Sequence, residues 1–250
     1  MIDPRHRHAL GTFLDVADAV ADVLRANTAW GASGMRVGQY AVDLDADRAC
    51  LDRLISAGFS VLSEESGVQG TAGRPVVVVD PLDGSTNASR GVPWFGTALC
   101  LVDVDGPAVA CVANHATGER FTAIRGYGAE RDGVAISVSA CEALDDAIVG
   151  VSGLPDHHYG WAQFRALGAS APDICAVASG TFDAWCDMSI DAHGVWDYLA
   201  SLLILQEAGG VAAEVGGREL VVLDHGARRT PAVASTPRLL EAVLAERRRP

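Results

Sequence analysis

Two aspartates at the end of an apolar segment are the residues whose types and spacing best suit chemistry. Asp80 and Asp83 come directly after four consecutive valines, residues 76–79. Such a run predicts a strand buried on both faces, so the carboxylates stand where this strand leaves the core. Two carboxylates about 4 Å apart repel by about 4 kcal/mol at an effective dielectric constant near ~20. A divalent cation removes this repulsion, and hard oxygen ligands favour Mg²⁺.

The segment after these aspartates suits a phosphate. Gly84, Ser85 and Thr86 offer backbone N–H groups and two hydroxyls where the chain must turn away from the strand. Backbone N–H groups in such turns bind phosphate oxygens. Carboxylates that hold a cation beside a phosphate cradle indicate metal-assisted phosphoryl chemistry.

Three further acidic groups could join Asp80 and Asp83 at one site. One follows the apolar segment 59–62, one stands at the start of an apolar helix, and one follows a glycine-containing loop. These groups are Glu64 with Glu65, Asp197, and Asp43 with Asp45. Each has an ordinary interpretation alone, as a solvated turn, a helix cap or surface charges at a helix start. Together with the first pair, they favour a shared cation site.

Composition argues against several kinds of partner. The 250-residue chain has a net charge of −13, and all 19 basic residues are arginine. An acidic surface disfavours nucleic acid and anionic membranes. The six cysteines form no CxxC pair and lie mostly in apolar runs, which predicts buried free thiols in a reducing cytoplasm. No run approaches the ~20 apolar residues of a membrane span, and no signal region follows the charged N-terminus.

Hydrophobic periodicity predicts an α+β first part and an α/β second part. Helices are expected at 10–25, 44–57, 157–167, 170–179, 195–208 and 237–247, with a loop at 31–38. Strands are expected at 59–62, 76–79, 95–103, 107–113, 119–124, 134–138, 147–151, 182–187, 211–215, 220–223 and 231–235. Turn signals make the strands between 95 and 138 an antiparallel meander. We expect two lobes, residues 1–140 with most acidic groups and residues 141–250 with Asp197.

Three acidic segments together resemble the signature segments of the inositol monophosphatase family of Mg²⁺-dependent, lithium-sensitive sugar phosphatases. These segments are 64–65, 80–87 and 196–197, and the pattern Asp-Pro-x-Asp-Gly-Ser/Thr-x-Asn in the second is highly specific. The likeness continues in the same order through 62–67, 126–129, 165–175, 178–184 and 207–210. It implies a layered αβαβα fold with two sheets and flanking helices, and an active site between the lobes.

The resemblance also implies ligands for two Mg²⁺ ions and a third, weaker cation. Glu64, Asp80 and the Leu82 carbonyl would hold the first ion, and Asp80, Asp83 and Asp197 the second. Asp43 would lie near the third, with Asp45 as the alternative. Gly84 and Ser85 N–H groups and the Thr86 hydroxyl would bind the phosphate. Glu64 and the Ser85 hydroxyl would orient the metal-activated water, which makes Glu64, Ser85 and Asp83 the catalytic residues.

The substrate wall is less well specified by the resemblance. Asp187 stands where inositol-specific members carry a glutamate that binds a hydroxyl, but its side chain is one methylene shorter. Ser170 either lines the sugar pocket or caps a helix, and Arg165 either meets a substrate anion or pairs with a structural acid. The spacing from 175 to 197 is about three residues longer than in inositol-specific members. Asp191 and His193, in this apparent insertion, are expected to be solvated.

The expected function is that of a cytoplasmic phosphomonoesterase acting on a small polyol or sugar phosphate, with inositol monophosphate as the nominal substrate. Histidinol phosphate, fructose 1,6-bisphosphate and a 3′,5′-bisphosphate nucleoside are alternatives. A catalytically silent, metal-binding relative is the alternative from another class. Relatives commonly form dimers, so the expected partners are a small phosphorylated metabolite and a second copy of the chain.

Overall fold

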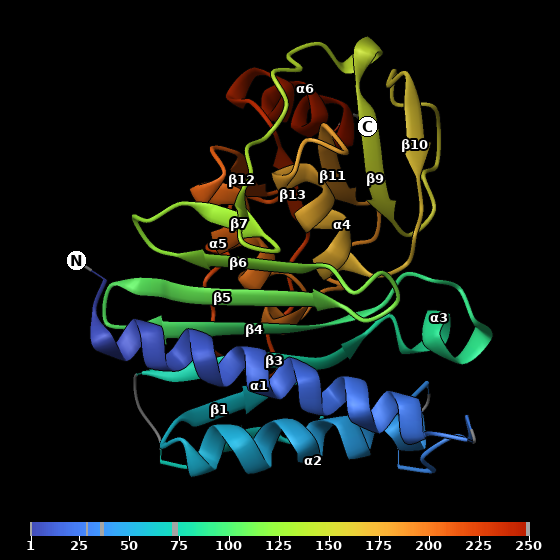
Figure 1. The fold of residues 1–250 in the computed structure, drawn as a ribbon. Helices are drawn as coiled ribbons and strands as arrows, with labels where there is room; N and C mark the ends of the chain where they lie inside the picture. Colours follow the sequence, from blue (N-terminus) through green and yellow to red (C-terminus); the bar gives the residue numbers. More distant parts are fainter. Residues whose placement is uncertain (1, 29, 36–37, 72–74, 249–250) are drawn as a thin grey trace.

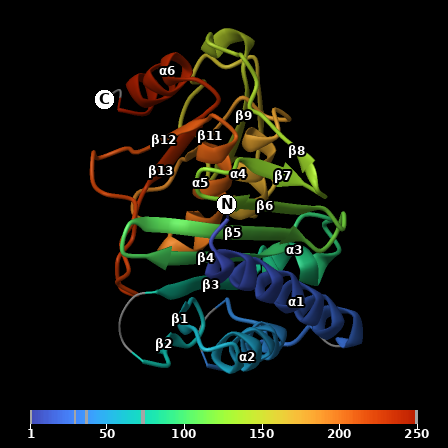
Figure 2. The ribbon, with the colours of Figure 1, turned by 60° about the vertical axis from the view of Figure 1, so that its left-hand side comes forward.

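Alternating layers of helix and sheet organise the part of the chain that the structure describes, residues 2–28, 30–35, 38–71 and 75–248 (Figure 1). In this computed structural model, helices α1 (Pro4–Ala26) and α2 (Ala41–Ser56) cover one face of a first sheet. Helices α4 (Ser170–Ala178) and α5 (Leu199–Glu207) lie between this sheet and a second one. Helix α6 (Pro237–Arg247) covers the far face of the second sheet (Figure 2). The layers therefore follow the expected αβαβα order.

The first sheet has the strand order β2-β1-β3-β4-β5-β6-β7-β8. Its strands are β1 (Ser60–Ser63), β2 (Gly67–Gln69), β3 (Val76–Asp83), β4 (Gly96–Asp103), β5 (Gly106–Asn114), β6 (Arg120–Ile124), β7 (Ala129–Arg131) and β8 (Val134–Ala135). Strand β1 runs parallel to β3 and β3 is antiparallel to β4, and the strands from β4 to β8 form the predicted antiparallel meander.

Strand β3 is buried on both faces, as its run of valines predicts. Val77 and Val79 contact the core beneath α1 and α2, whereas Val76 and Val78 contact the core around α4 and α5. Side chains alternate along a strand. Asp80 therefore continues the face of Val76 and Val78, toward the layer of helices between the sheets.

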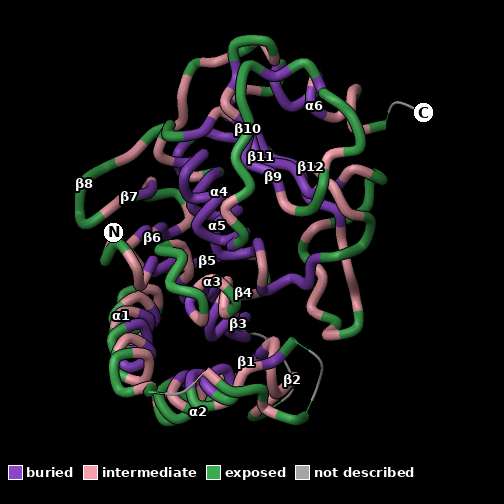
Figure 3. Tube along the Cα trace, turned by 90° about the vertical axis from the view of Figure 1, so that its right-hand side faces the viewer, coloured by how far each residue is buried: buried purple, intermediate pink, exposed green. Residues whose placement is uncertain are grey.

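The second sheet has the strand order β10-β9-β11-β13-β12. Its strands are β9 (Ile148–Ser152), β10 (Gln163–Arg165), β11 (Ala184–Asp187), β12 (Val211–Glu214) and β13 (Pro231–Ala234). Helix α5 is apolar on all sides, and α4 is buried throughout, because each is covered by both sheets (Figure 3). The division into lobes at residue 140 stays a proposal, since α4 and α5 share one core with the first sheet.

A carboxylate joins the two parts of the chain at the motif 126–129. Glu207, at the end of α5, accepts hydrogen bonds from the N–H groups of Gly126 and Gly128, each over 2.8 Å. Both glycines have positive φ, 79° and 83°, and so turn the chain to present two N–H groups to one carboxylate. This contact links two segments of the predicted resemblance that lie far apart in the sequence.

The predicted helix at 157–167 is wrong. The structure has irregular chain there, followed by the short strand β10 parallel to β9. His157 stacks on Tyr159 with ring centroids 4.1 Å apart, and Tyr159 stacks on Trp161 at 4.9 Å. Contacts between residues two apart require extended chain, because such residues do not face each other on a helix. Gly160, with φ 89°, also interrupts a helix.

Two predicted strands in other places are also wrong, wholly or in part. Residues 220–223 are irregular, and the Leu220 carbonyl accepts a hydrogen bond from the Tyr198 hydroxyl over 2.8 Å instead of joining a ladder. Of the strand expected at 134–138, only Val134–Ala135 is present, because the Val138 N–H donates to the Ala208 carbonyl at the end of α5.

Smaller differences concern the ends of elements. Helix α1 begins at Pro4 rather than residue 10, so His6 and His8 belong to it. Strands β2 and β7 and the short helix α3 (Ser85–Arg90) were not predicted. The predicted loop at 31–38 carries an isolated β-bridge from Ala32 to Tyr40, and its residues 36–37 lie outside the described residues. The cysteines are free and buried, except that Cys141 is half-buried. No helix among the described residues is long and apolar enough to span a membrane.

Candidate active site

A β-bulge at the end of β3 brings both of its aspartates to one site. Asp80 pairs with Ala98 of β4 and Asp83 pairs with Gly96, so residues 81–82 stand opposite a single residue of β4. A bulge bends its strand and re-aims the side chains that follow it. The Leu82 N–H donates a hydrogen bond to Asp80 Oδ1 over 3.0 Å, which fixes the first carboxylate within the bulge.

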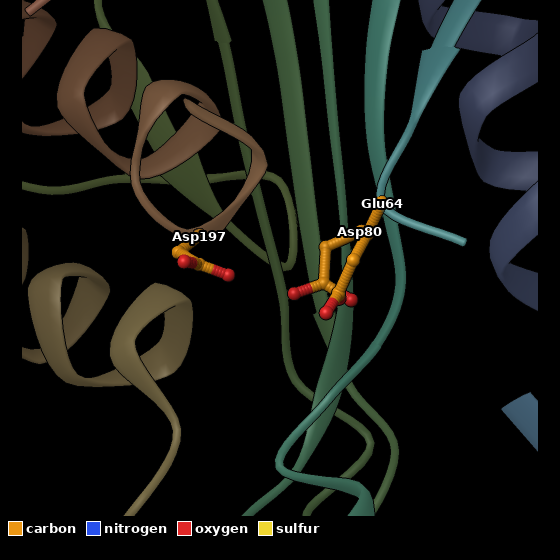
Figure 4. A group of neighbouring side chains, drawn as sticks. All are labelled: Glu64, Asp80 and Asp197. Atoms are coloured by element: carbon orange, nitrogen blue, oxygen red, sulfur yellow. The ribbon is translucent and has the colours of Figure 1, made fainter. Parts of the chain in front are cut away.

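Three carboxylates from separate elements meet beside this bulge (Figure 4). Glu64 follows β1, Asp80 belongs to β3, and Asp197 ends the short 3₁₀ turn η2 (Val195–Asp197) before α5. One carboxylate oxygen from each lies within 4.8 Å of the other two. Glu64 N–H donates to the Val79 carbonyl over 3.1 Å, and Gly194 N–H donates to Asp197 Oδ2 over 2.7 Å. Backbone hydrogen bonds thus hold the elements that deliver Glu64 and Asp197.

Asp83 joins this cluster to the start of α4. Its Oδ2 accepts a hydrogen bond from the Ala171 N–H over 2.6 Å. The neighbouring Ser170 hydroxyl donates to the Asp197 carbonyl over 3.1 Å. Helix α4 therefore contacts the ends of both β3 and η2, and it sets the relative positions of Asp83 and Asp197.

A polar pocket of about 390 Å³ opens over the carboxylates. Its lining residues are Gly38, Gln39, Asp43, Glu64, Glu65, Asp80, Leu82, Asp83, Gly84, Ser85 and Asp197. Asp43 is buried in the first turn of α2, where its Oδ2 accepts a hydrogen bond from Tyr40 N–H over 2.8 Å. Asp45 lies on the outside of α2, with its carboxylate 3.3 Å from Arg48. Of the two candidates for a third cation, the structure places Asp43 at the pocket.

The electrostatics of the cluster favour a bound cation. Burial and the charges of Glu64, Asp83 and Asp197 raise the pKa of Asp80 well above its usual value. Burial and the charge of Asp197 raise the pKa of Asp83 to about 7, and burial raises the pKa of Asp197. These groups resist ionisation together without a counter-charge. An all-oxygen set of carboxylates, with Asp80 buried and the others half-buried, fits divalent ions such as Mg²⁺.

The Gly-Ser-Thr segment forms the start of α3 at the rim of this pocket. Gly84 is the N-terminal cap of α3 with φ 83°, and a Cβ there would lie 2.9 Å from Ala169 Cβ and 3.1 Å from the Trp94 carbonyl. Only glycine fits this position. Gly84 and Ser85 line the pocket, whereas Thr86 is exposed and its hydroxyl bonds to the Tyr40 phenol. The backbone N–H groups of a helix start suit an anion.

The residues predicted for the substrate wall lie outside the lining of this pocket, as far as the structure describes the chain. Arg165 is exposed on β10 and donates to the carbonyl of Phe164 and to Gln163. Asp187 is fully buried; its Oδ1 accepts from Ser189 N–H over 2.8 Å, and its Oδ2 lies 2.9 Å from His193 Nδ1. These bonds make Asp187 an anchor for the loop that precedes Asp197.

The structure corrects the expectation for the inserted loop. His193 is buried, not solvated; its N–H donates to the Arg229 carbonyl, and its carbonyl accepts from Arg229 N–H. Burial alone would lower the pKa of His193, but the bond to Asp187 and the charges of Asp197 and Asp83 raise it. Asp191 forms an ion pair with Arg218. When protonated, the imidazole would favour the ionised forms of Asp83 and Asp197.

Sequence reasoning missed one polar residue of the pocket, Gln39. The Gln39 side-chain amide donates a hydrogen bond to Glu65, and its oxygen accepts one from the Ser33 hydroxyl over 2.6 Å. The pairing of Glu64 with Glu65 signalled an acidic turn, but nothing local pointed to Gln39. Its role depends on a contact between segments 26 residues apart, which periodicity does not encode.

Comparison with known proteins agrees with this geometry. The model of the inositol monophosphatase family matches residues 37–249 of the chain. The chain belongs to the inositol monophosphatase family. It is a phosphatase of this family, whose members act on small phosphorylated substrates and generally depend on a metal.

Curated relatives carry different names. The chain is 36% identical over 185 residues to a fructose-1,6-bisphosphatase/inositol-1-monophosphatase of Archaeoglobus fulgidus, covering 72% of this chain and 71% of the relative. It is 35% identical over 198 residues to an inositol-1-monophosphatase of Rhizobium meliloti, covering 71% and 73%. It is 30% identical over 205 residues to the Nus factor SuhB of Escherichia coli, covering 76% and 73%.

Solved structures share the fold of this inositol monophosphatase family member. An inositol monophosphatase from Anabaena superposes with a TM-score of 0.73 at 26% identity, covering 95% of this chain and 97% of that one. The extragenic suppressor protein suhB from Bartonella henselae superposes with a TM-score of 0.80 at 23% identity, covering 96% and 98%. The layered architecture is therefore the fold of the family.

Proposed function

We propose that this protein is a Mg²⁺-dependent phosphomonoesterase that hydrolyses a small polyol or sugar phosphate. One observation carries the proposal: carboxylate oxygens of Glu64, Asp80 and Asp197 lie within 4.8 Å of one another, in a pocket that Asp83, Gly84 and Ser85 also line. Acidic side chains at this density suit a cation, and the N–H groups beside them suit an anion. A phosphate ester would supply the anion, and a bound divalent cation would balance the carboxylates. The two together account for both halves of the site.

The proposed metal ligands divide into two overlapping sets. Glu64, Asp80 and the Leu82 carbonyl would hold one Mg²⁺, and Asp80, Asp83 and Asp197 a second, with Asp43 near a third cation. When bound, such ions act as Lewis acids on phosphate oxygens and lower the pKa of water near them. Burial raises the pKa values of Asp80, Asp83 and Asp197, and repulsion from neighbouring carboxylates adds to the shift of Asp80 and Asp83, which supports the assignment.

The other proposed roles belong to the chain's own polar groups. Gly84 and Ser85 N–H groups would bind the phosphate oxygens, and the Thr86 hydroxyl would join them by turning away from the Tyr40 phenol. The Glu64 carboxylate and the Ser85 hydroxyl would orient the water that attacks phosphorus. The carboxylate would accept a hydrogen bond from this water, and the hydroxyl would accept one from it or donate one to it. Serine in place of the family's usual threonine keeps this hydroxyl. Ser170, buried beside Asp83, remains a candidate at the sugar side of the site.

The substrate is proposed to be small and rich in hydroxyls. The pocket has about 390 Å³ of space and a polar lining, which suits a sugar or polyol monophosphate. Inositol monophosphate is the nominal substrate, and the names of the relatives keep fructose 1,6-bisphosphate as a second candidate. We also propose, from the buried free thiols and the family resemblance, that the protein acts in the cytoplasm as a homodimer.

A phosphate-release assay tests this proposal. The purified protein is incubated with inositol 1-phosphate, fructose 1,6-bisphosphate, histidinol phosphate and a 3′,5′-bisphosphate nucleoside, first with excess chelator and then with Mg²⁺. We expect no turnover in chelator and turnover on at least one sugar or polyol ester when Mg²⁺ is restored. Full turnover in chelator would refute the metal dependence, and no turnover on any ester with Mg²⁺ would favour a silent relative.

A further inference from the structure

Two hydrogen-bonded side chains, one buried and one half-buried, contact the bulge that carries the proposed metal ligands. Thr97, the second residue of β4, is fully buried, and its hydroxyl donates a hydrogen bond to the Pro81 carbonyl over 2.8 Å. The same hydroxyl oxygen lies 2.8 Å from Nε2 of His115, the residue that follows β5. None of these three residues lines the pocket, within the described ranges.

Thr97 occupies a unique place relative to the bulge. Asp80 pairs with Ala98 and Asp83 pairs with Gly96, so Thr97 is the residue of β4 that stands opposite both Pro81 and Leu82. A bulge leaves its extra residue outside the regular ladder of backbone hydrogen bonds. The Thr97 hydroxyl therefore donates to the Pro81 carbonyl, which the ladder leaves without a backbone donor at this point.

The direction of the hydrogen bonds follows from counting protons. The Pro81 carbonyl can only accept, so the single hydroxyl hydrogen of Thr97 points to it. The remaining contact is then satisfied when His115 Nε2–H donates to the hydroxyl oxygen. Burial lowers the pKa of His115 to about 4, so near neutral pH the imidazole carries one hydrogen, and the Thr97 contact places it on Nε2. The order His115, Thr97, Pro81 is a directed chain.

The chain ends where the proposed ligands begin. Pro81 lies between Asp80 and Leu82, and the Leu82 N–H already donates to Asp80 Oδ1 over 3.0 Å. Holding the Pro81 carbonyl fixes the Pro81–Leu82 peptide plane, because a peptide unit is rigid. The direction of Leu82 N–H, and with it one oxygen of Asp80, depends on that plane.

We propose that Thr97 and His115 are positioning residues that set the affinity of the site for divalent cations through the Pro81 carbonyl. This inference rests on the proposed function, because it concerns the ligands Asp80, Leu82 and Asp83. Removing a residue that orients a metal ligand without touching the metal typically weakens the affinity for the metal by about 10- to 100-fold. Thr97 and His115 lie outside the lining of the pocket, so their effect should pass through the cation ligands.

The test compares cation binding in variants of the whole chain without substrate. Thr97→Val removes the hydroxyl at nearly constant volume, Thr97→Ser keeps it, and His115→Phe removes the second donor. Isothermal titration with Mg²⁺ or Mn²⁺ gives the Kd, and melting curves with and without chelator report folding. Thr122→Val, the same replacement on strand β6, is the matched control.

We expect a Kd for the cation at least about 10-fold weaker in Thr97→Val, near wild type in Thr97→Ser and Thr122→Val, and weakened less in His115→Phe. Because His115 acts through Thr97, adding His115→Phe to Thr97→Val should weaken binding no further. With saturating cation, the KM for substrate should stay within about twofold of wild type in each variant.

Three outcomes are distinct. If wild type and Thr97→Val bind the cation equally, the inference is overturned while the proposed function stands. If Thr97→Val melts lower by the same amount with and without cation and its Kd is unchanged, the hydroxyl is structural only, and the inference is again overturned. If the wild-type protein binds no divalent cation, the proposed function falls and the inference falls with it.

Discussion

Replacing Asp83 with asparagine removes a charge and keeps the shape of the side chain, and we expect opposite effects on turnover and stability. The amide oxygen of asparagine can still accept the hydrogen bond that Ala171 N–H donates to Asp83 Oδ2 over 2.6 Å. The negative charge that repels Asp197 disappears. In a protein held in chelator, this repulsion has no cation to offset it.

The size of the stability effect follows from the pKa. Burial and Asp197 raise the pKa of Asp83 to about 7. Against an ordinary value near ~3.9, about 1.36 kcal/mol per unit sets a ceiling of about 4 kcal/mol at pH 8. The pocket opens to water and its carboxylates titrate together, so about 1–2 kcal/mol is the expected gain. For a chain of this length, that raises the melting temperature in chelator by about 2–8 °C.

Turnover should fall at least about 100-fold, because a cation contributes several kcal/mol to the transition state and about 1.36 kcal/mol is tenfold in rate. Phosphate release at saturating Mg²⁺ and melting in chelator at pH 8 measure both effects on one preparation. Asp103→Asn is the matched control. Burial opposes the shift there, but the hydrogen bond from Arg125, 2.8 Å away, lowers the pKa of Asp103. The control should therefore lower the melting temperature and leave turnover unchanged.

Two results would refute this reasoning. Asp83→Asn enzyme with a substantial share of wild-type turnover would place the reaction away from this carboxylate. A large fall in its melting temperature in chelator would show that the charge of Asp83 stabilises the folded chain, contrary to the repulsion from Asp197 described here.

Three other expectations concern pH, lithium and the inserted loop. In chelator, the free energy of unfolding should fall as pH rises from about 4 to about 7, because folded Asp83, with a pKa of about 7, keeps a proton that the unfolded chain has released. Urea-induced unfolding at several pH values measures this, and a free energy of unfolding that rises over the same pH range would contradict it. By the family resemblance, millimolar Li⁺ should inhibit phosphate release in the presence of Mg²⁺, and insensitivity would separate the chain from the lithium-sensitive members. Asp187→Asn should lower the free energy of unfolding by about 1–3 kcal/mol by disturbing the bond to His193, and should lower kcat with little change in the KM for substrate. A raised KM at an unchanged free energy of unfolding would instead indicate that Asp187 binds a substrate hydroxyl.

Local pattern was sufficient for the elements that carry the proposed metal ligands. The valine run predicted a doubly buried strand, and alternation along that strand predicts that Asp80 faces the layer of α4 and α5. The strand before Glu64 and the helix after Asp197 were also predicted from apolar periodicity. A shared site for these acidic groups was expected from their positions at the ends of elements, but the ligand sets came from the family resemblance, because no local rule says that residues 64, 80 and 197 meet.

The missed features depend on contacts between distant segments. The bulge at residues 81–82 is visible only in the register of β3 against β4, and Thr97 and His115 gain their roles from that register. The misplaced helix at 157–167 has helical spacing of apolar residues, but its aromatic rings stack on one another along an extended chain. Asp187 aligned with a substrate ligand, yet His193, six residues later, takes one of its oxygens.

The acidic cluster draws on both halves of the chain, and this has a consequence for how the protein is made. During synthesis, Glu64, Asp80 and Asp83 leave the ribosome more than a hundred residues before Asp197. A nascent chain that has formed only the first sheet therefore holds an incomplete set of ligands. If Asp197 is a ligand as proposed, hydrolytic competence arrives only once η2 has docked on the first sheet.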